Sequence, residues 1–422
     1  MSNYVFLEAA DRIGATLCRD AIWSQNKCNW TGWAIEFSGA GWGPVYRAQG
    51  PTLYDGAAGI AIFLAHLSAL TGDRLQRQAA VGALNCAFSG LDRLAPDFLS
   101  SIYSGAAGVA YAAIQAGEAL GERSMVRRGL DLLMSCTNTP LDGKWLDVLG
   151  GSAGCIPVLL QHGLVEEAVT HGKVLLRAAV KSDRGWSWDT MTGQTTANLT
   201  GYGHGAAGIA TALLELWRAT RDNEFKAAAL EAFRYEQSYF SQENHNWPDL
   251  RSMTAYGVPE SQTVYAVAWC HGAPGIGLAR LRALEILGDE PAIRHDLDAA
   301  IQSTLASLNA PGTNMSLCHG TAGNADLLID AARTLDRADL LLAAENAARQ
   351  AIGQQAQGDM PWPCGVNGGG ETPNLMLGLA GIGYFFLRLN NSRNVPSVLL
   401  LRGAAVRESV RLSASEAAAV SA

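Results

Sequence analysis

The sequence predicts an all-α protein, an α/α toroid of seven helical hairpins with an inner and an outer ring of helices. Seven four-residue Gly-x-x-Gly elements recur between residues 56 and 381 at intervals of 46 to 67 residues. A strongly apolar run of helical length follows most copies, and a more amphipathic segment comes next. Each apolar helix needs cover from neighbouring hairpins. Neither the first nor the last repeat resembles a polar cap, which favours a closed ring over an open solenoid.

The glycine elements give the expected order of the hairpins. They read GAAG, GAAG, GSAG, GAAG, GAPG, GTAG and GLAG, and begin at residues 56, 105, 151, 205, 272, 320 and 378. Inner helices are expected in runs such as IAIFLAHLSAL and IGYFFLRL, and outer helices in segments such as DRLQRQAAVGALNCAF. Glycine is unfavourable inside a helix. We therefore expect the paired glycines, which share one helical face, to allow a close approach of backbones.

Length and composition indicate one domain over residues 1–401. The chain has 422 residues, of which 48% are hydrophobic and 17% charged, so it is too apolar and too weakly charged to be disordered. No gap between repeats is long enough for an inserted second domain. Residues 402–422, which end in SASEAAAVSA, are expected to form a flexible tail.

Charge and hydropathy exclude two classes of partner. The formal net charge is -8, without the basic excess that is typical of nucleic-acid binding. The mean hydropathy of +0.06 does not indicate a membrane protein. The N-terminus lacks the basic and apolar regions of a signal peptide, so we expect a cytoplasmic protein. In that compartment the eight scattered cysteines favour metal or catalytic roles over disulfides.

The residue before each glycine element points to a site. Aspartate and serine there would be favoured N-caps of the following helix, whereas histidine is not a favoured cap. Three histidines at equivalent points of a pseudo-symmetric ring should converge near one end of the toroid. The alternative is that they are satisfied polar groups at helix starts. In chain order these residues are Asp55, Ser104, Gly150, His204, His271, His319 and Leu377.

Two of the loops carry the same Cys-His-Gly sequence. They are WCHGAPG at 269–275 and LCHGTAG at 317–323, and they offer four candidate ligands: Cys270, His271, Cys318 and His319. Two thiolates and an imidazole suit a tetrahedral zinc ion. Three protein ligands would leave a fourth position for water or substrate, as in catalytic zinc sites. The alternative is two buried cysteines packed beside helix starts.

These motifs resemble those of the lanthionine synthetase C-like family. The resemblance is carried by GYGHGAAGIA, WCHGAPGIGLARL, LCHGTAGNADLL and LGLAGIGYFFLRL, and it extends from about Trp30 to Leu401. The opening LYDGAAGIAIFLAHL and the ending VPSVLLL are most similar to the C-terminal cyclase domain of class II lanthipeptide synthetases. The N-terminal dehydratase domain of those enzymes has no counterpart here, so we expect either a stand-alone cyclase or an excised domain.

The resemblance implies one Zn²⁺ per chain and a set of site residues. By family motif, the metal ligands are Cys270, Cys318 and His319. The catalytic pair is Asp147 with His204. The chain departs from single-domain cyclases in two places. Ala266 stands where they often have arginine. The chain also has His271 where they often have tyrosine.

The implied reaction is an intramolecular Michael addition that forms (methyl)lanthionine rings. A peptide cysteine on zinc becomes a thiolate at neutral pH and attacks a dehydroalanine or dehydrobutyrine of the same peptide. His204 is the candidate acid that protonates the resulting enolate, and Asp147 would orient this histidine. The implied partners are a dehydrated precursor peptide and a separate dehydratase.

Three other functions remain open at this point. Related eukaryotic proteins add glutathione to dehydrated residues, which keeps the zinc chemistry but changes the nucleophile. A zinc-containing scaffold could bind precursor peptide or dehydratase without catalysis. A metal-free toroidal carbohydrate or terpene enzyme fits the architecture alone, but it leaves Cys270, Cys318 and His319 unexplained.

Overall fold

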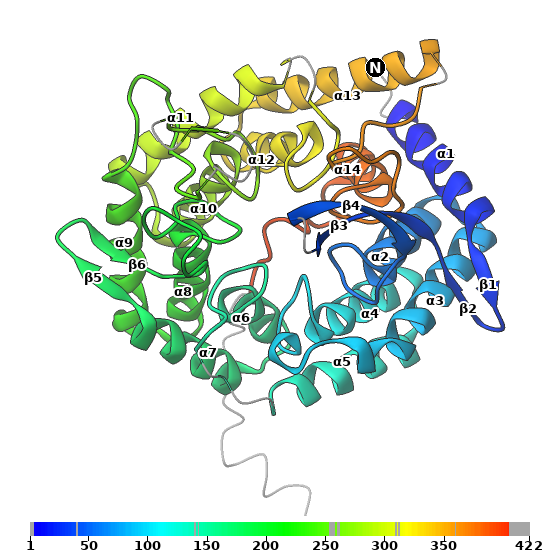
Figure 1. Ribbon diagram of the computed structural model, residues 1–422, viewed down its shortest axis with the longest axis horizontal. Helices are drawn as coiled ribbons and strands as arrows, with labels where there is room; N and C mark the ends of the chain where they lie inside the picture. The colour runs from blue at the N-terminus through cyan, green and yellow to red at the C-terminus, as the bar shows by residue number, and fades with distance from the viewer. Residues whose placement is uncertain are drawn as a thin grey trace, which may run out of the picture.

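A computed structural model describes residues 4–38, 41–138, 141, 143–252, 258–259, 262–308, 310, 313–358 and 360–404. Helices dominate these residues and form two concentric rings, as Figure 1 shows. The inner ring contains α2 (Ala57–Thr71), α4 (Ala106–Leu120), α6 (Ser152–Gln161), α8 (Ala206–Thr220), α10 (Ala273–Leu287), α12 (Thr321–Thr334) and α14 (Leu379–Asn391). The outer ring contains α1 (Tyr4–Asp20), α3 (Arg74–Ser89), α5 (Arg123–Cys136), α7 (Val165–Ala178), α9 (Asn223–Gln237), α11 (Pro291–Ser307) and α13 (Ala338–Gly358).

The α/α toroid is therefore confirmed, with one change in how its seventh pair forms. Six inner helices pair with the helix that follows them, whereas α14 packs against α1 from the other end of the chain. The apolar face of α1, which includes Phe6, Ile13 and Leu17, is buried. Helix α14 also contacts α2, so the ring closes. The seventh hairpin of the sequence prediction is thus assembled from the two ends of the described chain.

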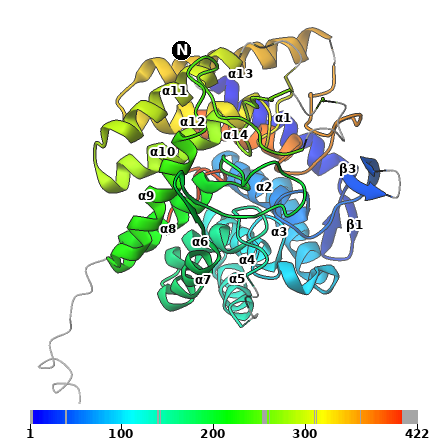
Figure 2. The same ribbon diagram turned by 60° about the vertical axis from the view of Figure 1, so that its left-hand side comes forward.

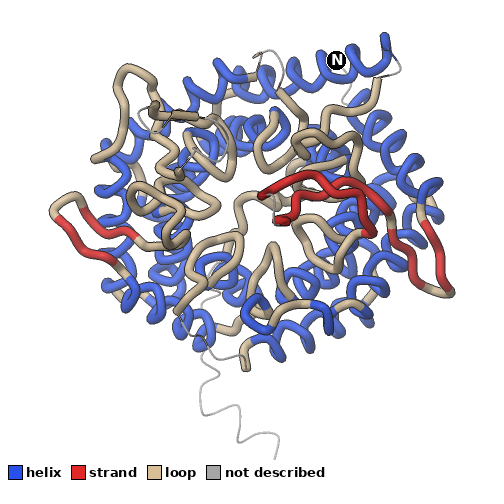
Figure 3. The backbone as a smooth tube through the Cα atoms, in the orientation of Figure 1, coloured by secondary structure: helices blue, strands red, loops and turns tan. Residues whose placement is uncertain are grey.

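Three β-hairpins project from the helical rings, and the sequence prediction did not include them. They are β1 (Ile22–Ser24) with β2 (Lys27–Asn29), β3 (Thr31–Ser38) with β4 (Gly41–Ala48), and β5 (Val180–Ser182) with β6 (Gly185–Ser187). All three pairs are antiparallel, and β3–β4 pairs Thr31 with Ala48. In the view down the rings, β3–β4 lies across the central region (Figures 1 and 3), and after rotation it stands out from the body (Figure 2).

The Gly-x-x-Gly elements open the inner helices. The first glycine of each element is the N-cap residue, and none of these seven caps has a side-chain hydrogen bond. A Cβ atom on the second glycine would collide with the carbonyl oxygen of the residue six positions earlier. The close backbone approach that we expected is thus made by the loop preceding each helix, which folds back over its first turn.

The predicted caps at Asp55 and Ser104 are wrong, because the following glycine takes the N-cap position in both helices. Asp55 instead accepts a hydrogen bond from Thr52 Oγ1 at 2.6 Å and pairs with Arg47 at 3.0 Å. An aspartate one residue too early cannot reach the free N–H groups of the first turn in the manner of a cap.

Backbone hydrogen bonds join the seven loops into a ring at this end of the toroid. The residue two positions before each glycine element takes part, and we call these seven residues the loop ring. At six of the seven steps a backbone N–H donates to the carbonyl of the next member, with N···O distances between 2.9 and 3.3 Å. At the remaining step Ser101 Oγ donates to the Leu149 carbonyl at 2.8 Å. The members are Tyr54, Tyr103, Leu149, Gly203, Cys270, Cys318 and Met376.

The C-terminal segment, residues 395–404, crosses the toroid beneath the loop ring. Its carbonyl groups accept hydrogen bonds from side chains of the loops that precede α4 and α10: Tyr103 Oη donates to Val398 at 2.6 Å, and Trp269 Nε1 donates to Leu399 at 3.0 Å. Val398 and Leu399 are almost completely buried. Residues 405–422, most of the predicted tail, lie outside the described part of the chain.

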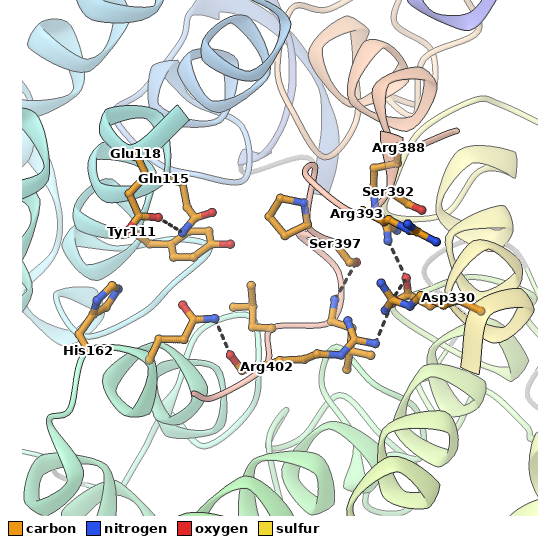
Figure 4. Close-up of a pocket in the computed structure, with 15 residues that line it drawn as sticks. Tyr111, Gln115, Glu118, His162, Asp330, Arg388, Ser392, Arg393, Ser397 and Arg402 are labelled. Carbon is orange, nitrogen blue, oxygen red and sulfur yellow. Dashed lines mark hydrogen bonds and ion pairs between the residues drawn. The ribbon is translucent and has the colours of Figure 1, made fainter. Parts of the chain in front are cut away.

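An ion-pair network joins the C-terminal ends of the inner helices. Figure 4 shows part of it beside a cavity of about 430 Å³. The network runs from α8 through α10 and α12 to α14, and Arg402 of the C-terminal segment lies between α10 and α12. Its four carboxylates alternate with guanidinium groups, and the exposed Arg333 adds one more guanidinium group 4.0 Å from Asp330. Its members are Glu215, Arg218, Arg282, Glu285, Asp326, Asp330, Arg388 and Arg402.

Among the described residues, we find no helix with the length and apolar character that a membrane crossing requires.

We expect Glu215→Gln to lower the free energy of unfolding by about 3 kcal/mol, because removing one partner of a buried ion pair leaves an uncompensated charge. Glu215 is fully buried and contacts Arg282 at 2.6 Å and Arg218 at 2.9 Å. Urea unfolding followed by circular dichroism measures the change. The control Glu8→Gln removes an exposed i,i+4 pair with Arg12 and should cost less than about 0.5 kcal/mol. Equal losses in the two variants would contradict this account of the network.

Candidate active site

The candidate site lies at the N-terminal ends of the inner helices, where the loop ring aligns adjacent loops. The Cys270 N–H donates to the Cys318 carbonyl at 3.3 Å, so two residues 48 positions apart in sequence become neighbours. The residue after each ring member precedes a glycine element. The three histidines at these positions therefore also belong to consecutive loops, as the repeat pattern predicted.

Three side chains in these loops could hold a metal ion. The candidate ligand atoms of Cys270, Cys318 and His319 all lie within 4.8 Å of one another. A tetrahedral zinc with ordinary Zn–S and Zn–N bonds separates its ligand atoms by about 3.5–3.8 Å. The donor set therefore fits such an ion after small side-chain adjustments. His271, the fourth candidate from the sequence, lies outside this group.

A backbone carbonyl orients His319. Its Nε2 lies 2.8 Å from the Gly365 oxygen. A carbonyl can only accept, so Nε2 carries the proton and Nδ1 keeps its lone pair for a metal. A Cβ at position 365 would lie 3.0 Å from His319 Nε2 and 2.7 Å from Ser316 Oγ. Sequence analysis missed Gly365, because its role depends on a carbonyl that any residue carries.

The two thiols form a coupled pair. Hydrogen bonding with Cys318, followed by burial, raises the pKa of Cys270 well above its ordinary value. Hydrogen bonding with Cys270 lowers the pKa of Cys318 against the effect of burial, and a further hydrogen bond with Tyr54 contributes. The hydrogen bond between the two sulfurs therefore favours a single thiolate in the pair, and a cation nearby would favour the second.

The structure also brings Asp147 and His204 together. His204 Nδ1 lies 2.6 Å from Asp147 Oδ2. The second carboxylate oxygen accepts from the Gly150 N–H at 2.7 Å, and Thr190 Oγ1 donates to the His204 carbonyl at 2.6 Å. The Asp147 side chain is 6% exposed and that of His204 is 26% exposed, so the imidazole reaches solvent while its partner does not. This is the arrangement in which a carboxylate fixes the orientation of a histidine.

The carboxylate sets the charge of His204. Burial lowers the pKa of this imidazole, but the charge and hydrogen bond of Asp147 outweigh burial. The net result is a pKa raised above the ordinary value for histidine. Asp147 therefore stabilises the protonated imidazole, whose Nε2 is able to donate a proton.

His271 lies beside this pair as a neutral imidazole. Its ring centroid is 5.7 Å from that of His204, and the side chain is buried. Burial lowers the pKa of His271 to about 3, with a smaller contribution from the positive charge of Arg251. His271 therefore contributes a hydrogen-bonding ring without a charge.

Arg251 is a cation that sequence analysis missed. It pairs with Asp249 at 2.6 Å and lies in an extended segment that bridges to Thr195. Its charge acts on the pKa values of both Cys270 and Cys318. Single-domain cyclases often have arginine at the position of Ala266. In this chain the arginine beside the cysteines comes from a different loop. Nothing in the sequence around 251 repeats or matches a motif, which is why periodicity did not indicate this residue.

Comparison with known proteins places these observations in a family. Residues 47–400 match the family model for lanthionine synthetase C-like protein. Over 210 residues the chain is 24% identical to the lacticin 481/lactococcin biosynthesis protein of Lactococcus lactis subsp. lactis, which covers 48% of this chain and 22% of that protein. The chain thus matches only about a fifth of the length of this curated relative.

Solved structures share the toroid. Nisin cyclase superposes with a TM-score of 0.57 at 17% identity, covering 82% of this chain and 89% of that one. A family 76 glycoside hydrolase from a bovine Bacteroides thetaiotaomicron strain gives a TM-score of 0.51 at 9% identity, covering 91% and 77%. At such identities the likeness shows the fold alone.

The resemblance inferred from the Cys-His-Gly loops and the other motifs is confirmed by the family model, whose match covers most of the chain. The chain belongs to the lanthionine synthetase C-like family.

Proposed function

We propose that this protein is a zinc-dependent lanthipeptide cyclase that joins peptide cysteines to dehydroalanine or dehydrobutyrine in the same peptide. One observation carries the proposal: consecutive loops present the Cys270, Cys318 and His319 donors together with the Asp147–His204 pair. The family and the named relatives, a lantibiotic biosynthesis protein and nisin cyclase, support this activity. The substrate would be a precursor peptide already dehydrated by a dehydratase.

Cys270, Cys318 and His319 would hold the zinc. When bound, zinc would lower the pKa of a substrate thiol so that a thiolate is available at neutral pH. The two protein thiolates would offset the charge of the ion and so keep the substrate sulfur nucleophilic. Gly365 keeps His319 in the tautomer and orientation that a ligand needs.

His204 would supply the proton that completes the addition. Attack on the β-carbon leaves negative charge on the acceptor, and protonation at Cα ends the reaction. Asp147 favours the charged form of this imidazole and fixes its direction. Arg251 supplies the positive charge that Ala266 does not, and we assign it the stabilisation of the developing negative charge.

We expect the purified protein to contain about one zinc per chain and Cys318→Ala to lose it, because two ligands hold zinc much more weakly than three. Elemental analysis by mass spectrometry measures the metal. Cys364→Ala is the matched control: Cys364 is half-buried and lies outside the ligand group, so it should retain zinc. A metal-free wild-type protein, after expression with added zinc, would contradict the proposal.

We expect His204→Ala to lower kcat for cyclisation by about 10²–10⁴-fold while zinc is retained, because a positioned proton donor contributes about that factor. His295→Asn, at an exposed side chain, should change kcat less than about two-fold. Mass spectrometry after alkylation of free thiols follows the reaction.

A parallel assay tests the choice of nucleophile. A dehydroalanine peptide without cysteine should not react with glutathione at a rate comparable to that of cyclisation. Rapid formation of the glutathione adduct would contradict an intramolecular cyclase.

The pH profile should report the pairing of His204 with Asp147. His204 acts in its protonated form, so kcat should fall as pH rises through its pKa, which Asp147 raises. Asp147→Asn removes the negative charge and lowers that pKa, so the decline should begin at lower pH. A profile whose alkaline limb does not move in Asp147→Asn would contradict this role.

A further inference from the structure

We propose that Glu236, on the outer helix α9, is a positioning residue that clamps the loop carrying His204. Its catalytic consequence rests on the proposed cyclase function. Glu236 is fully buried. Among the described residues, its carboxylate is bonded to Gly201, Ala207 and Arg280, and not to the metal donors or to Asp147. It acts on the backbone at both ends of the loop, and therefore through His204.

One carboxylate oxygen of Glu236 holds both ends of the loop. Oε1 accepts hydrogen bonds from the Gly201 N–H at 2.8 Å and from the Ala207 N–H at 3.0 Å. These two residues lie three positions before and three positions after His204. Gly201 has a φ of +100°, a backbone conformation that favours glycine. The loop is therefore closed into a turn whose two ends meet at a single atom.

The other carboxylate oxygen fixes the direction of Glu236. Arg280 Nη1 on α10 donates to Oε2 at 2.9 Å, and Arg280 Nε donates to Asp296 on α11 at 2.9 Å. The guanidinium also lies over the Phe233 ring at 4.1 Å. Arg280 and Glu236 are fully buried. A carboxylate held in this way cannot turn away from the loop without leaving buried charges unpaired.

Glu236 supplies the hydrogen-bond acceptor that the start of α8 lacks in its own sequence. The N-cap of α8 is Gly205, which has no side chain to accept from the first turn. Free N–H groups at a helix start need an acceptor, and a negative charge there is favourable. Glu236 provides both from the outer ring. Its contact at Ala207 is thus a helix cap contributed by another helix.

The loop that carries Cys270 is held in a similar way by a buried side chain, Asn246. This similarity supports the view that such contacts position the residues of the site. Asn246 Oδ1 accepts from the Ala273 N–H at 2.9 Å, and Asn246 Nδ2 donates to the Ala266 carbonyl at 2.9 Å. These contacts flank Cys270 in the same way that those of Glu236 flank His204. Two adjacent loops that carry the proposed chemistry are therefore each held at both ends by one buried side chain.

Two substitutions separate the clamp from the charge of Glu236. Glu236→Gln keeps an oxygen that can accept from Gly201 and Ala207, whereas Glu236→Met keeps the volume and removes the acceptor. Glu236→Met leaves Arg280 balanced by Asp296, so folding is expected to survive. Glu215→Met is the matched control, because Glu215 is equally buried but pairs with the arginine side chains of the network.

Two readouts test the proposal, and one of them does not need activity. Hydrogen–deuterium exchange of residues 201–207 should rise at least about ten-fold in Glu236→Met and stay near wild type in Glu236→Gln and Glu215→Met. In cyclisation assays Glu236→Met should lose about ten-fold or more in kcat with zinc content and KM little changed. The alkaline limb of its pH profile should shift, because His204 no longer keeps its fixed distance from Asp147. Glu236→Gln should restore most of kcat.

The possible failures are distinguishable. Unchanged exchange at 201–207 in Glu236→Met would overturn the clamp whether or not the protein is a cyclase. Equal loss in Glu236→Gln and Glu236→Met would assign the effect to charge and would also overturn it. A wild-type protein without cyclase activity would contradict the proposed function, while the exchange experiment would still decide whether Glu236 holds the loop.

Discussion

The loop ring is the constraint on which the arrangement of the site depends. Backbone hydrogen bonds between residues at the same position of each repeat fix the loops in register with one another. Any residue except proline can donate in this way, so the ring accommodates residues as different as Tyr54, Leu149 and Met376. The frame is independent of the side chains, and residues of consecutive repeats become neighbours wherever they lie in the sequence. Cys270 and Cys318 meet for this reason.

The opposite end of the toroid is held by a different kind of force. There the inner helices α8, α10, α12 and α14 are joined by buried ion pairs, and the C-terminal segment fills the space between them. Buried charges are costly unless each is paired, so this network defines one arrangement of the four helices. Three of these helices, α8, α10 and α12, follow the His204 loop and the two Cys-His-Gly loops. Rigidity at the C-terminal ends therefore supports the loops at the N-terminal ends.

The sequence predicted those features that repeat. The glycine elements gave the toroid, and the Cys-His-Gly loops gave four candidate ligands, because a residue type at a fixed repeat position has a meaning that a lone residue lacks. The choice of Cys270, Cys318 and His319 among these four came from the family resemblance. The pairing of α14 with α1 could not be predicted, since it joins the two ends of the described chain and no local pattern encodes it. Gly365, Arg251 and Glu236 were missed because each occurs once, outside the repeat, and acts through a carbonyl, a charge or an acceptor whose direction only the fold defines.

The loop ring accommodates many side chains, but at Gly203, the ring member beside Cys270, the site leaves no room for one. A Cβ atom at position 203 would lie 3.2 Å from both the Cα and the Cβ of Cys270. Such contacts are tight enough to displace the proposed ligand, whereas large side chains are accepted at Tyr54 and Tyr103. His204 follows Gly203 directly, so the position that leaves room for Cys270 also lies within the turn held by Glu236. The two halves of the proposed chemistry, metal ligand and proton donor, thus depend on one glycine of the frame.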